Sequence, residues 1–148
     1  MKRRGPRTRN VVLLVLVLVF AMLVLALWIG SDTGVPFAVL GALGITFGLL
    51  GVVLTVLTVR LHETRTQKTF FILTGVSAAG IPVCAILHNL VYALFIELFG
   101  KEFWGPRGDE PFFFILAVLV CPALFVIGAA ASGVLLIRAR LTGNEAHA

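Results

Sequence analysis

Four long apolar blocks, separated by short polar stretches, cover most of the chain. They occupy residues 11–30, 35–59, 70–96 and 111–137. An α-helix rises about 1.5 Å per residue, so roughly 20 apolar residues cross the hydrocarbon core of a bilayer, and each block is at least that long. The pattern predicts an all-α membrane protein in which four transmembrane helices form an antiparallel bundle with up-down topology.

The polar segments are too short to form a second domain. The connections at 31–34, 60–69 and 97–110 fall far below the roughly 40 residues from which a small soluble domain is built. Charged residues make up 13% of the 148, against about 25% in soluble proteins. We therefore expect a single integral membrane domain over residues 1–148. Its first block is interpreted as a retained anchor, because its apolar run exceeds a signal-peptide core.

Basic residues gather at one end of the expected bundle. Ten of the twelve Lys and Arg residues lie in the basic N-terminal tail 1–10, the connection 60–69 and the short C-terminal tail 138–148. The positive-inside rule places both tails in the cytoplasm. The basic tail is expected to attract anionic lipid rather than nucleic acid, because no aromatic residue is interleaved with its arginines. The lack of an Asn-x-Ser/Thr acceptor suits a prokaryotic plasma membrane.

The second block carries a stripe of small residues at helical contact spacing. Its members are Gly41, Gly44, Gly48, Gly51 and Thr55, separated alternately by three and four residues. Lipid tails are as apolar as leucine, so helices in a membrane gain contact energy mainly where small residues allow close approach. We expect this stripe to pack within the bundle, with self-association as the alternative.

The other blocks differ in the surface that they offer. Gly128 and Ser132, one turn apart in the fourth block, predict a second small-residue contact surface. The first block has almost no small residues and is expected at the periphery. Pro82 and Pro122 each lack a backbone N–H, so kinks are expected in the third and fourth helices.

Aromatic residues mark the expected outer membrane boundary. Trp28 closes the first block, and Phe103 and Trp104 lie in the connection before the fourth. Aromatic rings of this kind are typical interfacial anchors. Asp109 and Glu110 directly precede the proline that opens the fourth block, as expected at a helix start, where the dipole favours negative charge.

The third block alone places several polar side chains on one helical face, namely Ser77, Cys84, His88, Asn89 and Tyr92. Counted from the inner end, His88 lies about 30 Å along the helix, near the outer edge of the hydrocarbon. A polar pair at this depth commonly bonds another helix or water. We therefore interpret this candidate intramembrane cluster as structural, with a solute path as the alternative.

The thiols and the imidazole do not form a recognisable metal site. Cys84 and His88 are one turn apart, and Cys121 lies at a similar depth in the fourth block. Zinc usually takes four ligands in paired motifs, and neither the fourth ligand nor such a motif is evident. We expect no cofactor, no bound metal and two reduced, buried thiols.

Together these features predict a multi-pass integral membrane protein without evident catalytic machinery. The leading hypothesis is an accessory, structural or partner-binding helix bundle that associates with lipid, with copies of itself or with another membrane protein. The alternative is an oligomeric small-solute transporter or channel that uses the polar face of the third span. A third hypothesis is a membrane-embedded redox or metal-binding protein.

Overall fold

The computed structural model describes residues 4–34, 36–105 and 108–145. Four helical stretches within these ranges are long and apolar enough to cross a membrane, which confirms the four predicted spans. The elements in chain order are α1 (Arg4–Thr33), α2 (Phe37–Arg60), α3 (Arg65–Phe99), α4 (Pro111–Ile115), the π-helical turn η1 (Leu116–Val120) and α5 (Cys121–Glu145). The last three follow one another without a break and form the fourth span.

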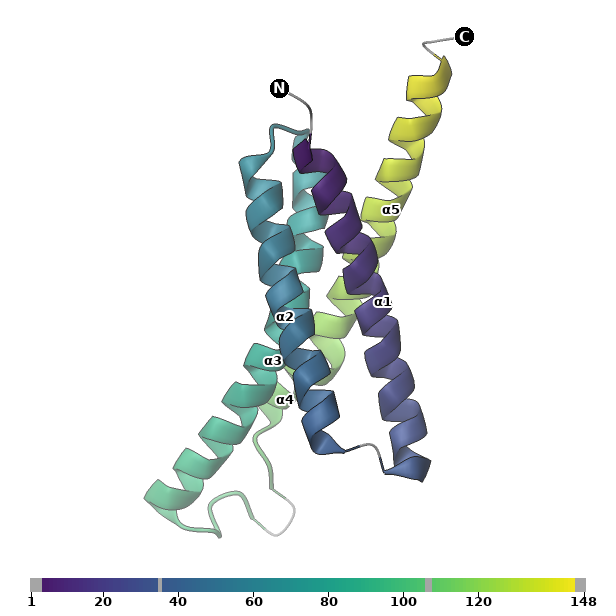
Figure 1. The fold of residues 1–148 in the computed structure, drawn as a ribbon. Helices are drawn as coiled ribbons and strands as arrows, with labels where there is room; N and C mark the ends of the chain where they lie inside the picture. Colours follow the sequence, from purple (N-terminus) through teal and green to yellow (C-terminus); the bar gives the residue numbers. More distant parts are fainter. Residues whose placement is uncertain (1–3, 35, 106–107, 146–148) are drawn as a thin grey trace.

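Neighbouring spans run antiparallel, so the predicted up-down bundle is confirmed. The start of α1 and the end of α5 lie at the same end of the bundle, which we call the terminal end (Figure 1). The connection between α2 and α3 also lies there, and the other two connections lie at the opposite end. α3 is central, because it packs against both α2 and the fourth span, whereas α1 packs mainly against α2.

Local signals fix both ends of the central helix. The hydroxyl of Thr64 precedes α3 and accepts a hydrogen bond from the backbone N–H of Gln67 at 3.4 Å. An N-cap of this kind satisfies a donor that has no partner within the helix. At the other end Gly100 has φ +86°, which glycine adopts without strain, and its N–H bonds the carbonyl oxygen of Ile96.

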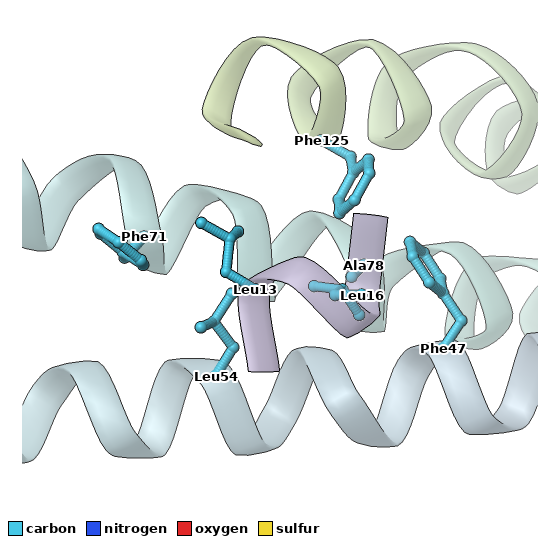
Figure 2. Packing of buried hydrophobic residues seen from close by; sticks show 7 residues of the cluster. All are labelled: Leu13, Leu16, Phe47, Leu54, Phe71, Ala78 and Phe125. Carbon is cyan, nitrogen blue, oxygen red and sulfur yellow. The ribbon is translucent and has the colours of Figure 1, made fainter. Parts of the chain in front are cut away.

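The buried core forms where side chains of all four spans meet (Figure 2). Three aromatic rings lie at its centre: the centroid of Phe125 lies 4.6 Å from that of Phe20 and 5.1 Å from that of Phe47. In lipid this contact is stabilised by dispersion and close packing, because lipid tails are no less apolar than the core. The buried cluster consists of Leu13, Leu16, Phe47, Leu54, Phe71, Ala78 and Phe125.

The backbones of α2 and α3 approach closely at two facing glycines. A Cβ placed at Gly51 would lie 2.5 Å from the carbonyl oxygen of Gly75 and 2.8 Å from the Cβ of Ala78. A Cβ at Gly75 would collide with the hydroxyl of Thr55. Part of the small-residue stripe on α2 therefore lies directly against α3.

The helices depart from regular geometry beside both prolines. Pro82 lies inside α3, and α3 bends so that its last part runs away from α2 (Figure 1). Pro122 follows η1, in which the N–H of Cys121 bonds the carbonyl oxygen of Leu116, five residues back. Proline has no N–H to continue the α-helical pattern, and the wider π turn accommodates it. The predicted irregularities are thus a bend in α3 and a π turn in the fourth span.

Candidate functional site

A polar contact joins α3 to the start of α4. Nδ1 of His88 lies 2.9 Å from the backbone carbonyl oxygen of Glu110 and 3.3 Å from its carboxylate oxygen Oε2. Nε2 of the same ring faces Oδ1 of Asp109 at 3.6 Å. His88, predicted from sequence as part of the polar face, therefore lies between two acidic residues of the preceding loop.

Glu110 is held in place by the helix that it begins. Its Oε1 and Oε2 accept hydrogen bonds from the backbone N–H groups of Phe112 and Phe113, each at 2.9 Å. Its own N–H donates to Oδ1 of Asp109 at 2.8 Å. Glu110 is only 5% exposed, so this capping replaces the water that the carboxylate loses. The fourth span therefore begins directly after Asp109 and Glu110, as the acidic pair predicted.

The contacts around His88 define the role of each ring nitrogen. Nδ1 faces two acceptor oxygens of Glu110, so it carries the proton and donates. Nε2 faces the carboxylate of Asp109, which is 59% exposed and open to solvent. The imidazole ring therefore lies between two carboxylates, that of Glu110, which is buried, and that of Asp109, which is exposed.

Aromatic side chains fold the outer loop back onto α3 next to this site. The ring of Trp104 stacks on Tyr92 with 6.1 Å between centroids, and its Nε1 donates to the carbonyl oxygen of Tyr92 at 3.4 Å. Phe103 packs against Phe95 and Phe99. Trp28, the remaining expected interfacial anchor, is a largely exposed residue near the end of α1.

The other members of the predicted polar face point in different directions. Ser77 is buried in the first half of α3, whereas Asn89 is exposed and its side-chain amide donates to the carbonyl oxygen of Ala85 at 2.8 Å. The thiols of Cys84 and Cys121 face each other across α3 and α5, and both are free. The five residues therefore do not line one continuous surface.

The described residues contain no group of three or more histidine, cysteine or acidic side chains arranged to hold a metal ion. Cys84 and His88 instead have separate partners, the thiol of Cys121 and the carboxylate of Glu110. Gly80 leaves space for the Cys121 thiol, since a Cβ there would lie 2.9 Å from its sulfur.

The predicted small residues also have distinct surroundings. Gly48 lies against the ring of Pro82, and Gly128 lies against Thr74, where a Cβ would be 2.6 Å from the hydroxyl oxygen. Ser132 is fully buried. A Cβ at Gly41 or Gly44 would meet no described atom within 4 Å.

A buried ion pair at the terminal end was not anticipated from the sequence. The guanidinium of Arg9 is paired with the carboxylate of Glu63, lies 3.8 Å from the ring centroid of Phe71 and donates to the side chain of Asn10. Arg9 is only 2% exposed. In the sequence Arg9 is one of five basic residues in the N-terminal tail, a pattern that indicates membrane orientation and not an ion pair. The sequence signal for a partner is Glu63, the one acidic residue of the connection 60–69.

Comparison with family models, with curated proteins and with solved structures finds no match for this chain. Its function is therefore argued from its own residues.

Proposed function

We propose that this protein is a partner-binding helix bundle, an accessory or structural subunit of a membrane assembly. The observation that carries the proposal is the small-residue stripe on α2, of which the described residues of the chain cover only part. Gly48 and Gly51 lie against α3, whereas Gly41 and Gly44 face open space.

The bend in α3 accounts for this division. Beyond Pro82 the last part of α3 runs away from α2, so the first turns of α2 lose the neighbour that covers its later turns (Figure 1). Glycines at contact spacing cost helix propensity and gain nothing against lipid. A second helix packed on Gly41 and Gly44 would recover dispersion energy that lipid chains cannot supply as closely.

The residues beside the open glycines suit a helix in lipid. Phe37, Ile45 and Leu49 are all largely exposed apolar side chains. The partner is therefore a transmembrane helix, from a second copy or from another membrane protein. Both sources use the same contact, and one experiment separates them.

The test places a photo-crosslinking amino acid at Ile45 in the full chain, expressed in its own membrane. We expect a cross-linked product that either doubles the chain mass or contains a second protein, and we expect Gly44→Ile to abolish it. Gly133→Ile is the matched control, because Gly133 is also a helical glycine with no described atom within 4 Å of a Cβ. Equal yields in the two variants, or no product from Ile45, would overturn the proposal.

A second candidate function is favoured by one observation, the ionisable contact between His88 and Glu110. An oligomeric small-solute transporter or channel could use this face of the third span, with the contact between His88 and Glu110 lining the solute path. The test is flux into vesicles that contain the oriented protein. If the protein is a transporter, we expect measurable flux that His88→Ala abolishes and that the control Asn89→Ala leaves intact. Absence of flux would reject this function.

We propose that the terminal end faces the cytoplasm of a prokaryotic cell. This rests on Arg7, Arg60, Arg65 and Arg140, which belong to the segments at that end. Single cysteines introduced at Arg60 or Glu102 in a chain without Cys84 and Cys121 test the orientation. We expect an impermeant maleimide to label position 102 in intact cells and position 60 only after lysis.

A further inference from the structure

We propose that a groove between α1 and α5 at the terminal end binds one anionic phospholipid, with its phosphate held between two arginines. This goes beyond the general attraction of a basic tail for a negative membrane, because it assigns a site with defined walls. The groove has a volume of about 580 Å³ and is lined by Pro6, Arg7, Asn10, Val11, Leu14 and Arg140. This volume lies within the about 300–1,000 Å³ typical of small-molecule sites.

The groove follows from the way the two helices cross. α1 and α5 meet where the rings of Phe20 and Phe125 lie 4.6 Å apart. From this contact the two helices diverge toward the terminal end (Figure 1). The groove lies where the helices have diverged, at the level of Arg7 and Arg140.

The groove has a charged upper part, formed by Arg7 and Arg140, and an apolar floor, formed by Val11 and Leu14. Arg7 comes from α1 and Arg140 from α5, both are exposed, and neither has an acidic partner among the described side chains. Arg9 differs sharply, since it is buried and paired with Glu63. No acidic residue lines the groove, so its two guanidinium groups are available for a phosphate, which they bind through paired N–H donors.

Asn10 adds a polar group between the arginines and the apolar floor. Its side-chain oxygen accepts hydrogen bonds from Arg9 at 3.1 and 3.3 Å. The amide nitrogen is the atom left to face a ligand, and it is a donor. The upper groove therefore presents donors only, which matches the acceptor oxygens of a phosphodiester.

The floor of the groove identifies a lipid as the occupant rather than a soluble anion. Arg7, Val11 and Leu14 follow a spacing of four and three residues, so they lie along one face of α1. Leu14 lies seven residues after Arg7, about 10 Å further along the helix, so this face runs from the headgroup level into the hydrocarbon. Val11 and Leu14 are both exposed apolar side chains. They offer an acyl chain a surface that a free phosphate would not use.

The experiment measures retained lipid on the full chain by native mass spectrometry. The protein is purified in detergent, supplied with phosphatidylglycerol or phosphatidylcholine, and released from the micelle. We expect one phosphatidylglycerol to remain bound and phosphatidylcholine to dissociate. The double variant Arg7→Gln/Arg140→Gln should weaken retention about tenfold, because both charge-assisted contacts are lost.

The matched control is Arg60→Gln/Arg65→Gln, which removes two exposed arginines from the same end but not from the groove. It should retain the lipid as the parent chain does. Equal losses in the two double variants would mean general surface attraction and would overturn the proposal.

Two further measurements test whether the ligand is a lipid or a soluble anion, and whether charge holds its phosphate. Glycerol phosphate added at the concentration of the lipid should not displace it, and complete displacement would identify a soluble anion as the ligand and reject the lipid. Arg7→Lys/Arg140→Lys keeps both charges but loses the paired N–H donors, so it should retain more lipid than the glutamine variant and less than the parent chain. If the lysine variant bound no lipid while its thermal unfolding in phosphatidylcholine matched the parent, the assignment of a charge-held phosphate would be wrong.

Discussion

His88 on α3 is hydrogen-bonded to Glu110, the residue that begins the fourth span, with 2.9 Å between Nδ1 and the backbone carbonyl oxygen. The same glutamate caps the backbone of the fourth span with its carboxylate. One residue thus ends the outer loop, starts a transmembrane helix and anchors that helix to its neighbour.

Removal of this carboxylate should destabilise the bundle. Glu110→Ala leaves the backbone N–H groups of Phe112 and Phe113 without their side-chain acceptor and removes the carboxylate from His88, which keeps its bond to the backbone carbonyl oxygen, and we expect it to lower the free energy of unfolding by about 2 kcal/mol. Glu110→Gln retains one acceptor oxygen and should cost about half as much. Unfolding by titration of a denaturing detergent measures both. Glu102→Ala is the control, because Glu102 is exposed in the same loop, and a loss equal to that of Glu110→Ala would contradict the capping role.

The glycines of the bundle should separate into two classes on substitution. Gly51→Ala inserts a methyl group 2.5 Å from the carbonyl oxygen of Gly75, and we expect a loss of about 1–3 kcal/mol through overpacking. Gly133→Ala adds its methyl group to open space, so the gain in helix propensity, up to about 1 kcal/mol, should leave stability unchanged or raised. The same detergent titration compares the two variants, and equal effects would show that the close approach of α2 and α3 is wrong.

The facing thiols of Cys84 and Cys121 should form a disulfide when a membrane-permeant oxidant is added. Each thiol gives up one proton and one electron, and diamide accepts both pairs as the S–S bond forms. The measurement is loss of maleimide labelling after the oxidised chain is unfolded. Cys84→Ser is the control and should leave Cys121 fully labelled. Unchanged labelling of the parent chain after oxidation would mean that α3 and α5 do not face each other at this position.

The ion pair at the terminal end should respond unequally to loss of either partner. Glu63→Gln leaves the buried guanidinium of Arg9 without its counter-charge, and we expect a loss of about 3 kcal/mol. Arg9→Met fills the same space without a charge and leaves a carboxylate that can reach water, so it should cost less. The stability difference between the two variants in detergent is the test, with Arg65→Gln as an exposed control. A larger loss for Arg9→Met would contradict it.

The sequence was sufficient to predict the architecture because lipid imposes strict limits on chain length and polarity. Four apolar blocks could only be helices of membrane-spanning length, and their short connections required antiparallel neighbours. The acidic pair before the fourth block likewise indicated a helix start. These inferences depend on residues close together in the chain.

The side-chain partners could not be predicted in this way. Glu110 reaches His88 across 22 positions, and this contact depends on how the aromatic loop folds back on α3. A helical wheel grouped Asn89 with His88, yet adjacent residues differ by about 100° around the axis and the two side chains face different surroundings. Arg9 could not be distinguished from its basic neighbours, because its burial depends on contacts with Glu63 and Phe71, which are distant in the sequence.

The π turn η1 determines which side of the fourth span contacts α3. A π turn is equivalent to one residue inserted into an α-helix, so it rotates everything beyond it by about 100° relative to what precedes it. Glu110 before the insertion and Cys121 and Gly128 after it all contact α3. Deletion of one residue from Leu116–Val120 would restore uniform winding, and the start and the remainder of this span could no longer both be in phase with the same neighbour.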